Sequence, residues 1–190
     1  MHADAQPAHT RGQFVCVFGI SGVGKSTLIE QFVRHHADWR SLAAGELLAR
    51  AVQRHPEHLR TSSPDVIEAN QYALAELIQD IRARKLTTNW LLDAHSLIDN
   101  GTELVPVPTA AISRLEPTAL LFLFDGPSQI LERRRADPRR RRPLPPIERI
   151  LQEQDLAYRT ALGYSDALKL TLQRIAVGDL TGFITALINK

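Results

Sequence analysis

Apolar residues gather along the chain in two patterns, short unbroken runs and longer periodic segments. Nearly unbroken runs lie at 14–18, 89–93 and 119–124, with a more mixed run at 169–177. Unbroken runs of this length are typical of strands buried on both faces of a parallel sheet. Residues 40–44 are more polar, and they predict a connector or a weak further strand.

The longer segments carry apolar residues every three or four positions, the spacing of a helix with one buried face. The strongest pattern runs from Pro64 to about Lys85, with Ser63 placed to cap the helix and Pro64 at its first position. Segment 95–108 contains the turn signal Asn100-Gly101 and two prolines, which predict a loop. Further helices are expected after residue 25, around 47–52, and at 110–115, 127–135, 147–162 and 179–188.

The alternation of strands and helices predicts an α/β fold, a three-layer sandwich around a parallel sheet of about five strands. Residues 14–190 are expected to form its single domain. Residues 1–13 contain two histidines, a proline and an aspartate but no apolar stretch. We therefore expect a disordered tail there rather than a signal peptide.

Composition narrows the classes of function. With 44% hydrophobic and 23% charged residues among 190, the chain has the balance of a soluble globular protein. Its longest apolar run, 119–124, is far shorter than the roughly 18 residues of a membrane span. The single cysteine, Cys16, excludes a disulfide framework, and a net charge of +2 demands no polyanionic partner. We expect a cytoplasmic protein with neither a membrane nor a nucleic acid as partner.

The stretch 19–27, Gly-Ile-Ser-Gly-Val-Gly-Lys-Ser-Thr, follows the first apolar run and opens a helical pattern. It fills every required position of the G-x-x-x-x-G-K-[ST] motif of P-loop NTPases. Its glycines let backbone N–H groups converge on phosphate oxygens, and the helix N-terminus adds partial positive charge. Lys25, expected to be exposed in the cleft, can reach the β- and γ-phosphates, and Ser26 can ligate Mg²⁺. The nucleotide-binding residues predicted here are Gly19, Ser21, Gly22, Val23, Gly24, Lys25, Ser26 and Thr27.

Asp93 ends an apolar strand, the position of an acid that holds Mg²⁺ in this class of protein. The alternative is an aspartate that only caps a turn. Because ligands bind at the carboxyl ends of parallel strands, Asp93 and the glycine loop are expected to share one cleft. His95, two residues later, can contact an acceptor phosphate or hydroxyl, unless the following loop holds it.

Seven arginines fall within residues 133–142. Arginines delivered by a closing segment can neutralise charge during phosphoryl transfer, so the proline-flanked stretch 136–146 predicts a short lid. The alternatives are a solvated surface or a nucleic-acid patch. Against the patch, no aromatic residue is interleaved for base stacking.

The glycine motif, the acid at the end of a later strand and the arginine-rich stretch follow one another along the chain. In this order they resemble the motifs of the archaeal-type adenylate kinases, within the nucleoside monophosphate kinase group. Beside the glycine motif, the resemblance rests on Asp93-Ala94-His95-Ser96, Arg133-Arg134 and Arg140-x-Arg142, and it extends from about Phe14 to Leu187. It implies ATP and Mg²⁺ as cofactors and small-molecule nucleotides as partners, with no oligomeric state predicted.

The resemblance also assigns roles to individual residues. Arg134 would lie near the donor adenine, while Arg140 and Arg142 would bridge donor and acceptor phosphates. An insertion at about 44–86 would bind the monophosphate. Its candidate residues, together with His95, are Gly45, the Arg60 region and Gln71.

The leading hypothesis is Mg²⁺-dependent transfer of the ATP γ-phosphoryl group to a nucleoside monophosphate, AMP first, or to another small phosphate or hydroxyl acceptor. The second is an ATPase or nucleotide-dependent switch that acts through a partner. The Asn-Lys-x-Asp motif that a Ras-type GTPase needs is not in the sequence. The third is a nucleic-acid-binding module built on residues 139–142.

Overall fold

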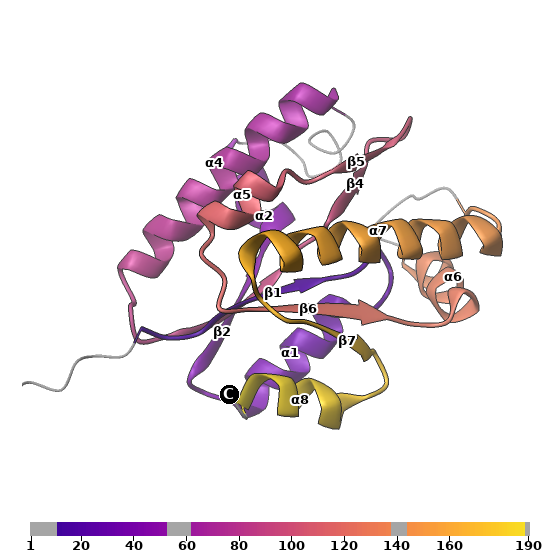
Figure 1. The fold of residues 1–190 in the computed structure, drawn as a ribbon. Coiled ribbons are helices and arrows are strands. Elements are labelled where there is room, and N and C mark those ends of the chain that lie inside the picture. The colour runs from indigo at the N-terminus through magenta and orange to yellow at the C-terminus, as the bar shows by residue number, and fades with distance from the viewer. Residues whose placement is uncertain (1–10, 53–61, 138–143, 189–190) are drawn as a thin grey trace, which may run out of the picture.

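The computed structural model describes residues 11–52, 62–137 and 144–188. Five strands form one parallel sheet in the order β2-β3-β1-β6-β7 (Figure 1). The strands are β1 Phe14–Phe18, β2 Trp39–Ala43, β3 Asn89–Asp93, β6 Ala119–Phe124 and β7 Leu172–Ala176. The predicted parallel sheet is confirmed. Of the polar stretch at 40–44, residues 40–43 belong to an edge strand, and residue 44 begins the next helix.

The most apolar strand lies at the centre of the sheet, where both faces are covered. All five side chains of β1 are fully buried. In the register of the sheet, Val17 pairs with Asp93 on one side and with Leu121 on the other. The carboxyl ends of β1, β3 and β6 therefore lie side by side at one edge, which is where ligands bind in sheets of this kind.

Helices cover both faces of the sheet and complete the three layers. α1 and α8 lie on one face, where the rings of Phe32 and Phe183 are 5.7 Å apart, and α4, α5 and α7 lie on the other (Figure 1). The helices are α1 Lys25–His35, α2 Ala44–Ala51, α4 Pro64–Ala83, α5 Thr109–Arg114, α6 Pro127–Ala136, α7 Ile147–Leu168 and α8 Leu180–Ile188. Within the described ranges, no helix is both long and apolar enough to cross a bilayer.

Segment 95–108 differs from the predicted loop because it contains a small antiparallel hairpin. β4 (Leu97–Asp99) pairs with β5 (Leu104–Pro106) across the Asn100-Gly101 turn. Asn100 Oδ1 accepts hydrogen bonds from the backbone N–H groups of Thr102 and Glu103, at 2.9 and 2.8 Å. The turn was predicted correctly from the sequence. The two strands were not, because three residues are too few to show the alternation of apolar and polar side chains that is typical of a strand.

The two ends of the domain also differ in detail from the prediction. Residues 1–10 of the predicted tail lie outside the described residues, whereas Gly12 and Gln13 are held against the body of the domain. The Gly12 N–H donates to the Leu86 carbonyl and the Gln13 N–H to Asn89 Oδ1, both at 2.8 Å. Near the other end, α7 continues to Leu168, beyond the predicted end at residue 162.

Candidate active site

The glycine loop joins β1 to α1 at the centre of the sheet edge. Its backbone is left-handed at Gly22 (φ +82°) and Gly24 (φ +109°), conformations that favour glycine. Gly24 is the N-cap residue of α1, so the helix begins at Lys25. The first N–H groups of a helix have no partner within it, and here they adjoin the N–H groups of the loop. The arrangement can bind an anion, as the motif predicts.

Lys25 is only 5% exposed, so the prediction of an exposed lysine was wrong. Its Nζ donates to the carbonyl oxygens of Gly19, at 2.7 Å, and Ile20, at 3.3 Å. It also lies 3.8 Å from Asp93 Oδ1. The lysine is buried because the loop that precedes it folds over its side chain and supplies the acceptors for its ammonium group.

Asp93 and the glycine loop meet, as the strand order predicts. Ser26 Oγ donates a hydrogen bond of 2.6 Å to Asp93 Oδ2. One hydroxyl and one carboxylate thus lie together at the carboxyl ends of β1 and β3, beside the Lys25 ammonium group. Such oxygen atoms are the ligands that Mg²⁺ prefers, and Mg²⁺ takes few of them from the protein because it retains waters and phosphate oxygens.

His95 contacts the first residue of the glycine loop, with its Nδ1 3.1 Å from the Gly19 carbonyl oxygen. Its position is set by the next residue: the buried Ser96 donates from Oγ to the Ala157 carbonyl of α7, at 2.8 Å. From α7 the Tyr164 hydroxyl in turn contacts the carbonyls of Ser96, at 3.2 Å, and Val107, at 2.6 Å. Burial raises the pKa of Tyr164, so the hydroxyl stays a donor. Ser96 therefore anchors the His95 segment to α7.

Arg134 lies against the glycine loop and is 7% exposed. Its Nε donates to the Ser21 carbonyl at 2.8 Å, and its Nη2 is 3.0 Å from each carboxylate oxygen of Glu153 on α7. Arg134 therefore lies at the predicted nucleotide site. Its shortest described polar contact is with the glycine loop, at the Ser21 carbonyl.

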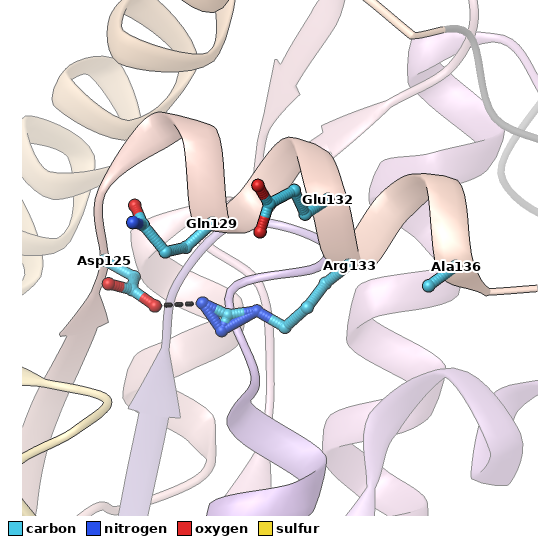
Figure 2. A pocket seen from close by; sticks show the side chains of 5 residues that line it. All are labelled: Asp125, Gln129, Glu132, Arg133 and Ala136. Carbon is cyan, nitrogen blue, oxygen red and sulfur yellow. Dashed lines mark hydrogen bonds and ion pairs between the residues drawn. The ribbon is translucent and has the colours of Figure 1, made fainter.

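Arg133 turns to a different side of α6, where an open hollow of about 360 Å³ is lined by Asp125, Gln129, Glu132, Arg133 and Ala136 (Figure 2). Figure 2 shows Arg133 reaching back to Asp125, with which it forms an ion pair. Asp125 follows β6, and its backbone N–H and carbonyl both pair with the side-chain amide of Gln154 at 3.2 Å. A Cβ added to Gly24 would lie 3.6 Å from Arg133 Nη1, which places this guanidinium beside the start of α1.

Of the predicted acceptor residues, His95 contacts the glycine loop, whereas Gly45 and Gln71 lie on two helices, α2 and α4. Gly45 is in the first turn of α2, and Gln71 is half-buried on α4, which packs against α2. Three predicted residues, Arg60, Arg140 and Arg142, lie outside the described residues, as does the central part of the predicted lid. Their roles stay predictions.

Two further residues beside the glycine loop and α6, Asp125 and Glu153, were not predicted from the sequence motifs. Asp125 carries the same signal as Asp93, a carboxylate directly after a buried parallel strand, and the strand-end rule would have found it. Glu153 has no local signal, because it is one of several acidic residues on a long helix and its partner lies on another one.

Comparison with known proteins finds a family and relatives that match most of the chain. The model of a domain family described as "AAA domain" matches residues 18–151. The chain is 31% identical over 158 residues to an adenylate kinase of Thermococcus kodakarensis, with 80% of this chain and 79% of that one covered. It is 29% identical over 147 residues to an adenylate kinase of Pyrobaculum aerophilum, with 74% and 72% covered.

Two solved structures share the fold at low sequence identity. A shikimate kinase from Bacteroides thetaiotaomicron is 12% identical with a TM-score of 0.62, and the match covers 94% of this chain and 99% of that one. A sugar kinase from Janibacter is 18% identical with a TM-score of 0.56, over 94% and 95% of the two chains. These likenesses support the three-layer fold.

Proposed function

We propose that this chain, which belongs to the AAA domain family and to the adenylate kinase-like P-loop kinases, is a Mg²⁺-dependent phosphotransferase. It would move the γ-phosphoryl group of ATP to a nucleoside monophosphate, with AMP as the leading acceptor. The observation that carries the proposal is the 2.6 Å contact between Ser26 Oγ and Asp93 Oδ2, with Lys25 Nζ 3.8 Å from the other oxygen of that carboxylate. This contact between the glycine loop and the candidate metal-binding acid supports the proposal.

The donor triphosphate would bind in the glycine loop. The N–H groups of residues 22–27 would surround its phosphate oxygens, and Lys25 Nζ would exchange the carbonyls of Gly19 and Ile20 for those oxygens. Ser26 and Asp93 would hold Mg²⁺, which supplies positive charge to the donor phosphates when bound. With charge balanced in this way, positioning supplies most of the catalysis, and no covalent intermediate is required.

His95 would lie between the donor and the acceptor. Two observations support this: its Nδ1 is 3.1 Å from the Gly19 carbonyl oxygen, and it comes two residues after Asp93, the last residue of β3. We assign to it a contact with the acceptor group, whose phosphate or hydroxyl must approach the γ-phosphorus from the side opposite the leaving oxygen. Arg134 would lie near the donor adenine and the loop.

The acceptor would bind between α2 and α4. Gly45 leaves the first turn of α2 open, since a Cβ added there would meet nothing within 4 Å. Gln71 offers a side-chain amide from α4, and Arg60 would offer a positive charge to the monophosphate. Arg140 and Arg142, delivered by the lid, would neutralise charge that develops during transfer.

A product assay tests the proposal. Purified protein with ATP and Mg²⁺ is offered AMP, CMP, UMP, GMP and dAMP separately, and diphosphate products are separated by chromatography. We expect ADP in excess of an acceptor-free control with AMP, and loss of transfer in Lys25→Ala. Because Lys25 is buried and paired with Asp93, the melting temperature of this variant must be measured alongside.

The outcomes distinguish the alternatives. Diphosphate formed with a different monophosphate keeps the reaction class and changes the acceptor. ADP released equally with and without every acceptor would refute the proposal and favour the ATPase or a kinase of another metabolite.

A further inference from the structure

We propose that Glu153 is a positioning residue for the donor phosphates: through Arg134 it holds the Ser21–Gly22 peptide with its N–H directed into the phosphate site. The inference rests on the proposed function, since it concerns the loop that would bind ATP. Neither the glycine motif nor the resemblance assigns Glu153 a role.

The first step is the ion pair between α6 and α7. Arg134 Nη2 lies 3.0 Å from both Oε1 and Oε2 of Glu153. The two side chains are 6% and 13% exposed, so water screens the pair only weakly. When one partner of a buried ion pair is removed, the other is left charged in a poorly solvated place, so such pairs hold their geometry firmly. The position of the guanidinium is therefore set by Glu153.

The same guanidinium group also contacts the glycine loop, so its fixed position constrains that loop. Arg134 Nε donates to the Ser21 carbonyl at 2.8 Å. The peptide bond that follows is trans, and in a trans peptide the C=O and N–H point to opposite sides. Because Arg134 Nε binds the Ser21 carbonyl, the Gly22 N–H points to the side away from Nε, and under the proposal this is the side on which phosphate would bind.

The third step is steric. Gly22 is left-handed, and a Cβ added to it would lie 2.8 Å from Arg134 Cγ, so the stem of the arginine lies directly on the loop. A shift of Arg134 is thus transmitted to Gly22. Lysine at position 134 could supply positive charge, but its three N–H donors share one nitrogen, whereas here two nitrogens of a rigid planar group, Nε and Nη2, contact Ser21 and Glu153.

The test is the affinity for ATP with Mg²⁺, measured by isothermal titration calorimetry on the full chain. Glu153→Gln keeps the size of the side chain but removes its charge, and we expect the Kd for ATP to rise about tenfold, the scale of 1.4 kcal/mol. Glu148→Gln is the matched control, because Glu148 is exposed in the first turn of the same helix. The KM for the acceptor is expected to stay unchanged, which separates a role at the donor phosphates from a general loss of structure.

A double-mutant cycle tests the route of the effect. In an Arg134→Ala background, Glu153→Gln is expected to leave the Kd for ATP unchanged, because the residue it acts through is gone. Glu153→Asp is a second variant that keeps the charge and supports the proposal if it binds ATP more tightly than Glu153→Gln.

Three results would overturn the inference. They are wild-type affinity in folded Glu153→Gln, an additive effect in the Arg134→Ala background, or an equal rise in the acceptor KM. Wild-type protein that binds no ATP would overturn the proposed function as well. Wild-type protein that binds ATP but phosphorylates no acceptor would refute only the kinase reaction.

Discussion

Gly22 occupies a motif position at which any residue is allowed, yet the geometry of the loop predicts that alanine there is damaging. Its φ of +82° is strained for any residue with a Cβ, at about 1–2 kcal/mol. The added methyl would also lie 2.8 Å from Arg134 Cγ, and Arg134 is held at Ser21 and Glu153. Overpacking of this kind adds about 1–3 kcal/mol.

The total cost of about 2–5 kcal/mol can reduce either the stability of the protein or its affinity for ATP. If the loop keeps its conformation, the free energy of unfolding falls by that amount, measured by urea denaturation followed by circular dichroism. If the loop relaxes instead, stability is retained and the affinity for ATP is lost, because the N–H groups no longer converge. The two measurements together capture the whole effect.

Gly163→Ala is the control. Gly163 lies within α7, and a Cβ there would meet nothing within 4 Å. Alanine is favoured over glycine inside a helix, so this variant is expected to gain about 0.4–1 kcal/mol of stability. A Gly22→Ala protein with both the stability and the ATP affinity of the wild type would refute the reasoning about the loop.

Further predictions concern three residues at the strand ends and in the core, Tyr164, Cys16 and Asp93. Tyr164→Phe removes the hydroxyl that contacts the carbonyls of Ser96 and Val107. This variant is expected to lower the free energy of unfolding by about 1–2 kcal/mol, measured as a lower Tm. An unchanged Tm would contradict this prediction. Burial raises the pKa of Cys16 from 9.0 to about 12, so its thiol should resist iodoacetamide at pH 8.5 in native protein and react in urea. Because the unfolded thiol loses its proton at lower pH than the folded one, this group should also make the free energy of unfolding fall as pH rises from 9.0 to about 12. A smaller fall in Cys16→Ala, in matched titrations, is expected. Asp93→Asn should lower the rate of Mg²⁺-dependent transfer about 100-fold or more while leaving a folded protein, and transfer at the wild-type rate would exclude Asp93 as a metal ligand.

The features that the sequence predicted well are those with a local signal. β1, β3 and β6 are central strands, and burial on both faces makes their residues almost uniformly apolar. β2 lies at the edge with two exposed side chains, so its pattern is mixed and the prediction was weaker. The contact between the glycine loop and Asp93 could also be predicted, because the carboxyl ends of parallel strands meet wherever the sheet order brings them together.

The sequence by itself determined the glycine loop, the metal-binding candidates and the parallel sheet, since each depends on residue types at short, regular spacing. Only the tertiary structure decided that Lys25 is buried, that Ser96 anchors His95 to α7, and that Glu153 reaches the loop through Arg134. Ser21 and Arg134 are 113 positions apart, and no periodicity links residues at such a distance. Contacts of this kind follow from how helices pack on the sheet, so they become visible only when the chain is folded.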